Sequence, residues 1–129
     1  MINVTPPVSD DMSGPASASP DRPIDLVHLA RMTLGDRSLE REVLQLFERQ
    51  TAMLVARVRE GSRCAAGALA HTLKGSARGV GAGRVACAAE AVELASVSGG
   101  DGDLKSAVER LAAAADEARA VIAELLRAN

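Results

Sequence analysis

The side chains best suited to chemistry in this 129-residue sequence lie around His71. A neutral imidazole nitrogen is a competent nucleophile near pH 7. Lys74, Gly75 and Arg78 follow at spacings of three, four and seven residues, so a helix places them on the same side as His71. Cations at this spacing would stabilise the roughly two negative charges that a phosphoryl group brings. The spacing indicates phosphoryl chemistry, although an exposed histidine among basic residues is usually an ordinary surface residue.

A helix from about residue 63 to about residue 79 must present His71 to solvent. The opposite face carries the apolar residues that a bundle would bury, namely Ala66, Leu69, Leu73, Ala77 and Val80. Gly75 is informative because glycine within a helix costs about 1 kcal/mol relative to alanine. Close approach of another protein would explain that cost. We therefore expect a docking surface at Gly67, Ala68 and Gly75, and phosphate stabilisation by Lys74 and Arg78.

The remaining sequence predicts four further helices around this one. Asp25 can cap a short helix that Gly35 ends, and Asp36 or Ser38 can start a longer one. Glycines between residues 79 and 83 supply a turn before a helix from about residue 84. Another glycine-rich turn precedes a last helix capped by Asp101 or Asp103. The expected buried residues of the second, fourth and last helices are Leu39, Val43, Leu46, Phe47, Leu54, Val58; Val85, Ala88, Ala89, Val92; and Leu104, Ala107, Val108, Leu111, Ala115, Ala118, Ile122, Leu125.

Short connections between amphipathic helices favour an all-α fold, an antiparallel four-helix bundle with an additional short N-terminal helix. This bundle should occupy residues 23–129. All five prolines lie at or before Pro23, among serines, which predicts a disordered Pro/Ser-rich tail over residues 1–22.

Composition excludes several function classes. The 15 basic and 17 acidic residues nearly cancel, and Phe47 is the single aromatic residue, so nucleic acid is not an expected partner. No apolar run approaches the ~20 residues that cross a bilayer, and no secretory signal is visible, so we expect a cytoplasmic protein without membrane contact. No phosphate loop of the nucleotide-binding type is present, which argues against an ATP site.

The other candidate residues favour structural roles. Cys64 and Cys87 are expected to be reduced, small packing residues inside helices. Cys64 and His71 lie two helical turns apart, about 10.5 Å, too far to share a metal ion unaided or to form a catalytic pair. His28 is expected to be structural or merely exposed. Two interpretations stay open for the last three candidates, steering of an acidic partner or ordinary solvated charges; these candidates are Arg57, Arg59 and Arg63.

The run from His71 to Ala77, His-Thr-Leu-Lys-Gly-Ser-Ala, followed by Val80-Gly81-Ala82, resembles the signature of histidine-containing phosphotransfer (HPt) domains. The likeness continues through Val92-Glu93 and covers residues 24 to 127. Arg78-Gly79 departs from the pattern, because small or polar residues are common there, which weakens the role given to Arg78.

The resemblance implies a monomeric phosphocarrier and not an enzyme. Its His71 would exchange a phosphoryl group with aspartates of receiver domains in hybrid histidine kinases and response regulators, with Lys74 supporting the phosphate and Gly75 leaving room for the receiver. It implies no cofactor or metal of its own, because the receiver would supply Mg²⁺. Two alternatives stay open: a helical adaptor that binds a kinase or receiver without carrying phosphate, and the dimerisation domain of a histidine kinase. The absence of an ATP-binding motif favours the free phosphocarrier over the second.

Overall fold

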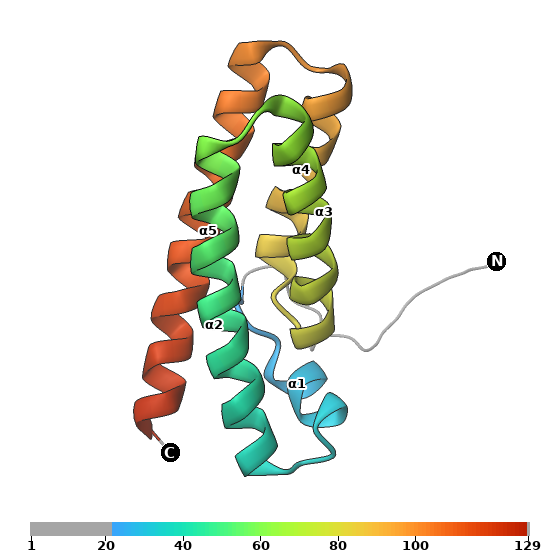
Figure 1. The fold of residues 1–129 in the computed structure, drawn as a ribbon. Coiled ribbons are helices and arrows are strands. Elements are labelled where there is room, and N and C mark those ends of the chain that lie inside the picture. The colour runs from blue at the N-terminus through green and yellow to red at the C-terminus, as the bar shows by residue number, and fades with distance from the viewer. Residues whose placement is uncertain (1–21, 129) are drawn as a thin grey trace, which may run out of the picture.

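The computed structural model describes residues 22–128, and this part of the chain contains five helices and no strand. α1 (Leu26–Met32) is short, and the long helices are α2 (Arg37–Glu60), α3 (Arg63–Val80), α4 (Gly83–Ser98) and α5 (Asp101–Ala128). α2 and α4 each pack against both α3 and α5, so the four long helices close into one bundle (Figure 1). The expected antiparallel four-helix bundle with a short N-terminal helix is confirmed. The tail expected over residues 1–22 lies, apart from Arg22, outside the described residues.

Side-chain caps fix where α1, α2 and α5 begin. The carboxylate of Asp25 accepts a hydrogen bond from the backbone N–H of His28, and Asp36 accepts one from Leu39, each at 3.0 Å. Such bonds satisfy N–H groups that the first turn leaves without a partner. α5 uses the reciprocal arrangement, because Asp103 in its first turn reaches back to accept from the N–H of Gly100 at 2.9 Å. The caps expected at Asp25 and Asp36 are therefore confirmed, whereas α5 begins at Asp101 and is capped by Asp103 from within its first turn.

The core consists of small and aliphatic side chains, with Phe47 only 2% exposed. The expected apolar stripe of α2 was partly wrong, because Leu39 is 41% and Leu46 is 60% exposed. These two residues lie seven apart on one outer face. The buried face of α2 repeats at spacings of three and four residues and consists of Leu44, Phe47, Thr51, Leu54 and Val58.

Both cysteines were wrongly expected to be packing residues. Cys64 lies in α3 and Cys87 in α4, but the two thiols are free and their residues exposed. Ala66 near Cys64 and Ala86, Ala88 and Ala89 around Cys87 are buried, so these smaller side chains fill the close helix contacts instead.

α1 is attached to the far end of α3. The N–H of Asp25 donates to the carbonyl of Gly81 at 2.8 Å, and Nε2 of His28 donates to the carbonyl of Gly79 at 3.1 Å. Gly81 ends α3 in the left-handed conformation, with φ of +85°. A Cβ at this position would lie 3.0 Å from the carbonyl oxygen of Asp25, so glycine permits the close approach of α1. His28 is thus an exposed residue with a structural contact.

Candidate functional site

His71 projects outward from the middle of α3. Its side chain is 69% exposed, whereas Ala70 and Leu73 on the inner side of the same helix are fully buried. The division into faces follows from the helical repeat, because residues two positions away from His71 point to the opposite side. The predicted exposure of this imidazole is therefore confirmed, and approach from solvent is open.

Glu93 of α4 holds both His71 and Lys74. Its Oε2 lies 2.7 Å from Nδ1 of His71, and its Oε1 lies 2.6 Å from Nζ of Lys74. The Lys74 side chain is only 15% exposed and that of Glu93 only 23%, so this ion pair is shielded from water more than ordinary surface pairs. One carboxylate therefore connects the imidazole to the nearest cation.

The charge state of Glu93 follows from this arrangement. Contact with the Lys74 ammonium lowers the pKa of Glu93, with a smaller lowering effect from His71, and both act against the desolvation that raises it. Glu93 is consequently ionised at neutral pH. A carboxylate only accepts hydrogen bonds, so Nδ1 of His71 carries the ring proton and donates it to Glu93.

This tautomer determines which nitrogen can react. With the proton on Nδ1, the lone pair of the neutral ring is on Nε2, which is the atom turned away from Glu93. Fixing one ring nitrogen by a hydrogen bond orients the other, as it does for histidines that bind metals. The site therefore presents a single oriented nitrogen nucleophile to solvent.

The sequence prediction missed the role of Glu93, although a signal was present. α3 and α4 form a hairpin about Ala82, and His71 and Glu93 are each eleven residues from that point. Residues equally far from the turn of an antiparallel hairpin face each other. An acid at this distance from the turn was therefore identifiable as the partner of His71 once the turn had been located.

Glycine at position 67, one helical turn before His71, allows α3 and α4 to lie close together there. A Cβ added there would overlap Oγ of Ser96 and lie 3.1 Å from its Cβ. Gly75 differs, because a Cβ there would meet nothing within 4 Å. Packing within the described residues therefore does not explain why position 75 is glycine. The docking roles expected for Gly67, Ala68 and Gly75 stay predictions.

The structure does not bring Arg78 to the imidazole. Its guanidinium lies 4.0 Å from Glu90, and the side chain is 60% exposed. Two helical turns separate Arg78 from His71 along α3, whereas Lys74 lies one turn away and shares Glu93 with His71. Of the two cations, Lys74 is the better placed to meet a phosphoryl group on the ring.

The arginines at the end of α2 and the start of α3 have different environments. Arg63 donates to the carbonyls of Ala95 at 2.7 Å and Gly99 at 3.0 Å, and it pairs with Asp101 at 2.7 Å. It therefore closes the turn between α4 and α5 and serves the fold. Arg59 pairs with Glu109 on the surface at 3.2 Å. A steering role for Arg57 and Arg59 stays a prediction.

A groove of about 730 Å³ borders the imidazole. Its lining includes Cys64, Gly67, Ala68, Glu93 and Val97 in addition to His71. The side chain of Val97 is 87% exposed, so the groove has an apolar rim. Within residues 22–128, no group of three or more histidine, cysteine or acidic residues could hold a metal ion, and no helix is long and apolar enough to cross a membrane.

The comparison with protein-family models matches residues 41–128 to the Hpt domain. The matched range includes α3 and α4 and therefore His71, Lys74 and Glu93. Neither the curated proteins nor the solved structures gave a match.

Proposed function

This chain belongs to the Hpt domain family, and on that premise we propose that it relays a phosphoryl group between aspartates of receiver domains, with His71 as the carrier. Histidine phosphotransfer in two-component signalling is the general role of the family, and Hpt domains are phosphocarriers without a catalytic site of their own. The observation that best supports His71 is its outward imidazole, 69% exposed and oriented by Glu93.

In the proposed reaction, Nε2 of His71 attacks the phosphorus of an aspartyl phosphate on a docked receiver. The new N–P bond forms as the bond from phosphorus to the aspartate oxygen breaks, and the aspartate leaves as a carboxylate. The ring gains positive charge during attack, which Glu93 stabilises through Nδ1. The second transfer reverses these steps, with an aspartate of another receiver attacking the phosphoryl group.

Positioning and charge stabilisation supply most of the rate in phosphoryl transfer. Lys74 is one turn from His71 and can exchange its contact with Glu93 for one with the phosphoryl oxygens. The receiver brings its own acidic pocket and Mg²⁺, so this chain needs no cofactor. Gly75 and the groove beside His71 leave room for that domain. A monomeric, cytoplasmic protein is part of the same proposal.

The proposal is tested by incubating the full chain with a receiver domain phosphorylated on its aspartate. We expect label on this chain that is labile in acid and stable in alkali, and we expect His71→Gln to abolish it. His28→Gln is the matched control, because His28 is the other histidine of the sequence and its ring hydrogen-bonds the carbonyl of Gly79 near the end of α3. A stable complex without label transfer would contradict the relay and favour the adaptor.

A further inference from the structure

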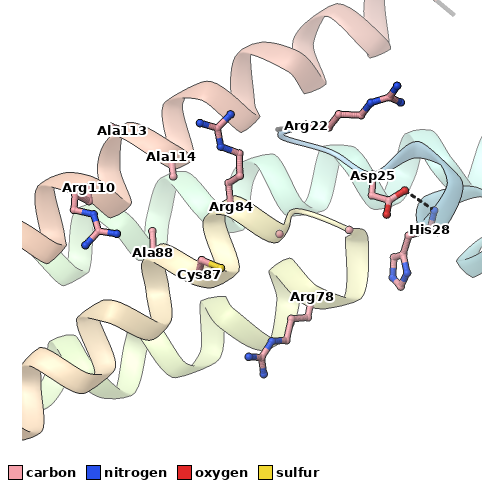
Figure 2. A pocket seen from close by; sticks show the side chains of 12 residues that line it. Arg22, Asp25, His28, Arg78, Arg84, Cys87, Ala88, Arg110, Ala113 and Ala114 are labelled. Carbon is pink, nitrogen blue, oxygen red and sulfur yellow. Dashed lines mark hydrogen bonds between the residues drawn. The ribbon is translucent and has the colours of Figure 1, made fainter. Parts of the chain in front are cut away.

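A second groove lies on another part of the bundle, away from His71. It has a volume of about 720 Å³ and lies among the residues before α1, the end of α3, α4 and α5 (Figure 2). It shares no lining residue with the groove beside His71. A partner could therefore occupy it while a receiver domain engages the imidazole.

Arginines dominate the charge of this second groove, which we call the arginine groove. Its lining includes Arg22, Arg78, Arg84 and Arg110, and the one acidic lining residue is Asp25. The carboxylate of Asp25 is already used, because it accepts the hydrogen bond that caps α1. The groove thus offers an excess of guanidinium groups, which pair with carboxylates through bidentate hydrogen bonds.

Two of these guanidinium groups have acidic neighbours outside the lining. Arg84 lies 3.1 Å from Glu117, and Arg78 lies 4.0 Å from Glu90. The four side chains of these two pairs are 42% to 60% exposed. Exposed pairs of this kind contribute little to stability, so carboxylates of a partner can replace them at small cost. Within residues 22–128, Arg110 has no ion-pair partner.

The floor of the arginine groove consists of small groups. Between the arginines lie Cys87 and Ala88 of α4 and Ala113 and Ala114 of α5 (Figure 2). Small side chains leave the hollow open, and their apolar character suits an aliphatic side chain of modest size. No phenylalanine, tyrosine or tryptophan lines the groove, so any stacking surface there is limited to His28 and the guanidinium groups.

The directions of the arginines favour an extended ligand over a compact anion. Figure 2 shows that Arg22, Arg84 and Arg110 extend from three different segments in different directions and do not converge on one point. A single phosphate would need donors that converge on it. A polypeptide with carboxylates spaced along its length can meet dispersed guanidinium groups one after another.

We propose that the arginine groove binds an acidic segment of a partner protein, with an aliphatic side chain against Cys87, Ala88 and Ala113 and carboxylates on the surrounding arginines. Such binding would tether a signalling partner near His71 without covering the imidazole. A tether raises the effective concentration of the partner to the millimolar range. The proposal does not depend on the phosphoryl relay, because it rests on different residues.

The test uses the full chain and a fluorescein-labelled 12-residue peptide in which aspartate and glutamate alternate with alanine and leucine. Fluorescence anisotropy should show saturable binding that weakens with salt, and the same peptide with asparagine and glutamine should not bind. Arg110→Gln should weaken binding about threefold to fivefold. Ala113→Glu, which adds a negative charge to the floor, should weaken it more than tenfold.

Matched controls separate the groove from general charge effects. Arg127→Gln and Ala123→Glu make the same chemical changes at exposed positions of α5 outside the groove, and they should leave peptide affinity unchanged. His71→Gln should also leave it unchanged, even where that variant abolishes phosphoryl transfer. The proposal is overturned if the neutral peptide binds as well, if Ala113→Glu has no effect, or if tripolyphosphate displaces the peptide at equal charge concentration, because the last result would indicate a general anion site.

Discussion

Replacing Glu93 with glutamine should slow phosphoryl transfer to His71 without removing the nucleophile. Glutamine keeps the size of the side chain but removes the charge that faces Nδ1 at 2.7 Å. Because the ring becomes positive as Nε2 attacks, that charge stabilises the transition state more than the neutral ground state. Glutamine can also present its amide group to the ring, so the Nδ1–H tautomer is no longer enforced.

The size of the effect follows from distance and exposure. Two unit charges 2.7 Å apart attract by about 1.5 kcal/mol when water screens them fully. His71 is mostly exposed, so this value applies better than the larger values of protein interiors. About 1.4 kcal/mol corresponds to a tenfold change in rate, and we therefore expect transfer to slow by roughly tenfold. Lys74, released from Glu93, can move closer to the phosphoryl group and offset part of the loss.

The assay is rapid-quench transfer from a phosphorylated receiver, at saturating concentrations so that chemistry is measured apart from docking. Glu90→Gln is the control, because it removes the same charge from the same helix at a residue that neighbours Arg78 and not His71. Glu93→Gln should be slow and Glu90→Gln normal. Equal rates for wild type and Glu93→Gln would refute the reasoning, as would equal slowing in both variants.

Four further predictions concern packing, docking and pH. Gly67→Ala forces α3 and α4 apart at Ser96 and should lower the free energy of unfolding by about 1–3 kcal/mol, measured by urea titration, with partial recovery in Gly67→Ala/Ser96→Gly. Gly75→Ala should stabilise the fold by about 0.5–1 kcal/mol yet weaken receiver binding in calorimetry; unchanged binding would remove Gly75 from the docking surface. Thr51→Val removes a buried hydroxyl without a partner in the described residues and should stabilise by about 1 kcal/mol in the same titration, whereas a loss would indicate a missed hydrogen bond. Lys74, and less strongly His71, lower the pKa of Glu93, so its carboxylate stabilises the fold above its unfolded pKa and that contribution is lost as pH falls through the folded pKa; wild type should exceed Glu93→Gln in stability at pH 7, and the difference should shrink as pH falls below the ordinary glutamate value of 4.5. A stability difference between wild type and Glu93→Gln that persists at low pH would show that it arises from packing and not from the charge of Glu93.

Local sequence signals predicted the helices and the exposure of His71 well. Asp25 and Asp36 are caps in the structure because a short acidic side chain before an apolar repeat bonds to its own backbone. Those signals act within a few residues and need no knowledge of the partner helix. The outward direction of His71 likewise required only the helical repeat.

The errors arose where the neighbouring helix decides the outcome. Leu39 and Leu46 fit an apolar repeat, but α3 and α5 cover the adjacent face of α2 and leave these residues exposed. Periodicity alone cannot choose between two apolar faces of one helix. The contact between His71 and Glu93 joins two helices, so it could be inferred only after the turn at Ala82 had been placed.

The most direct test of the account is to find which atom carries the phosphoryl group. The phosphorylated protein, labelled with ¹⁵N, can be assigned by tandem mass spectrometry for the residue and by NMR for the ring nitrogen. The account predicts phosphorylation of His71 on Nε2, with Nδ1 still protonated against Glu93. A phosphoryl group on Nδ1, or on a residue other than His71, would contradict it.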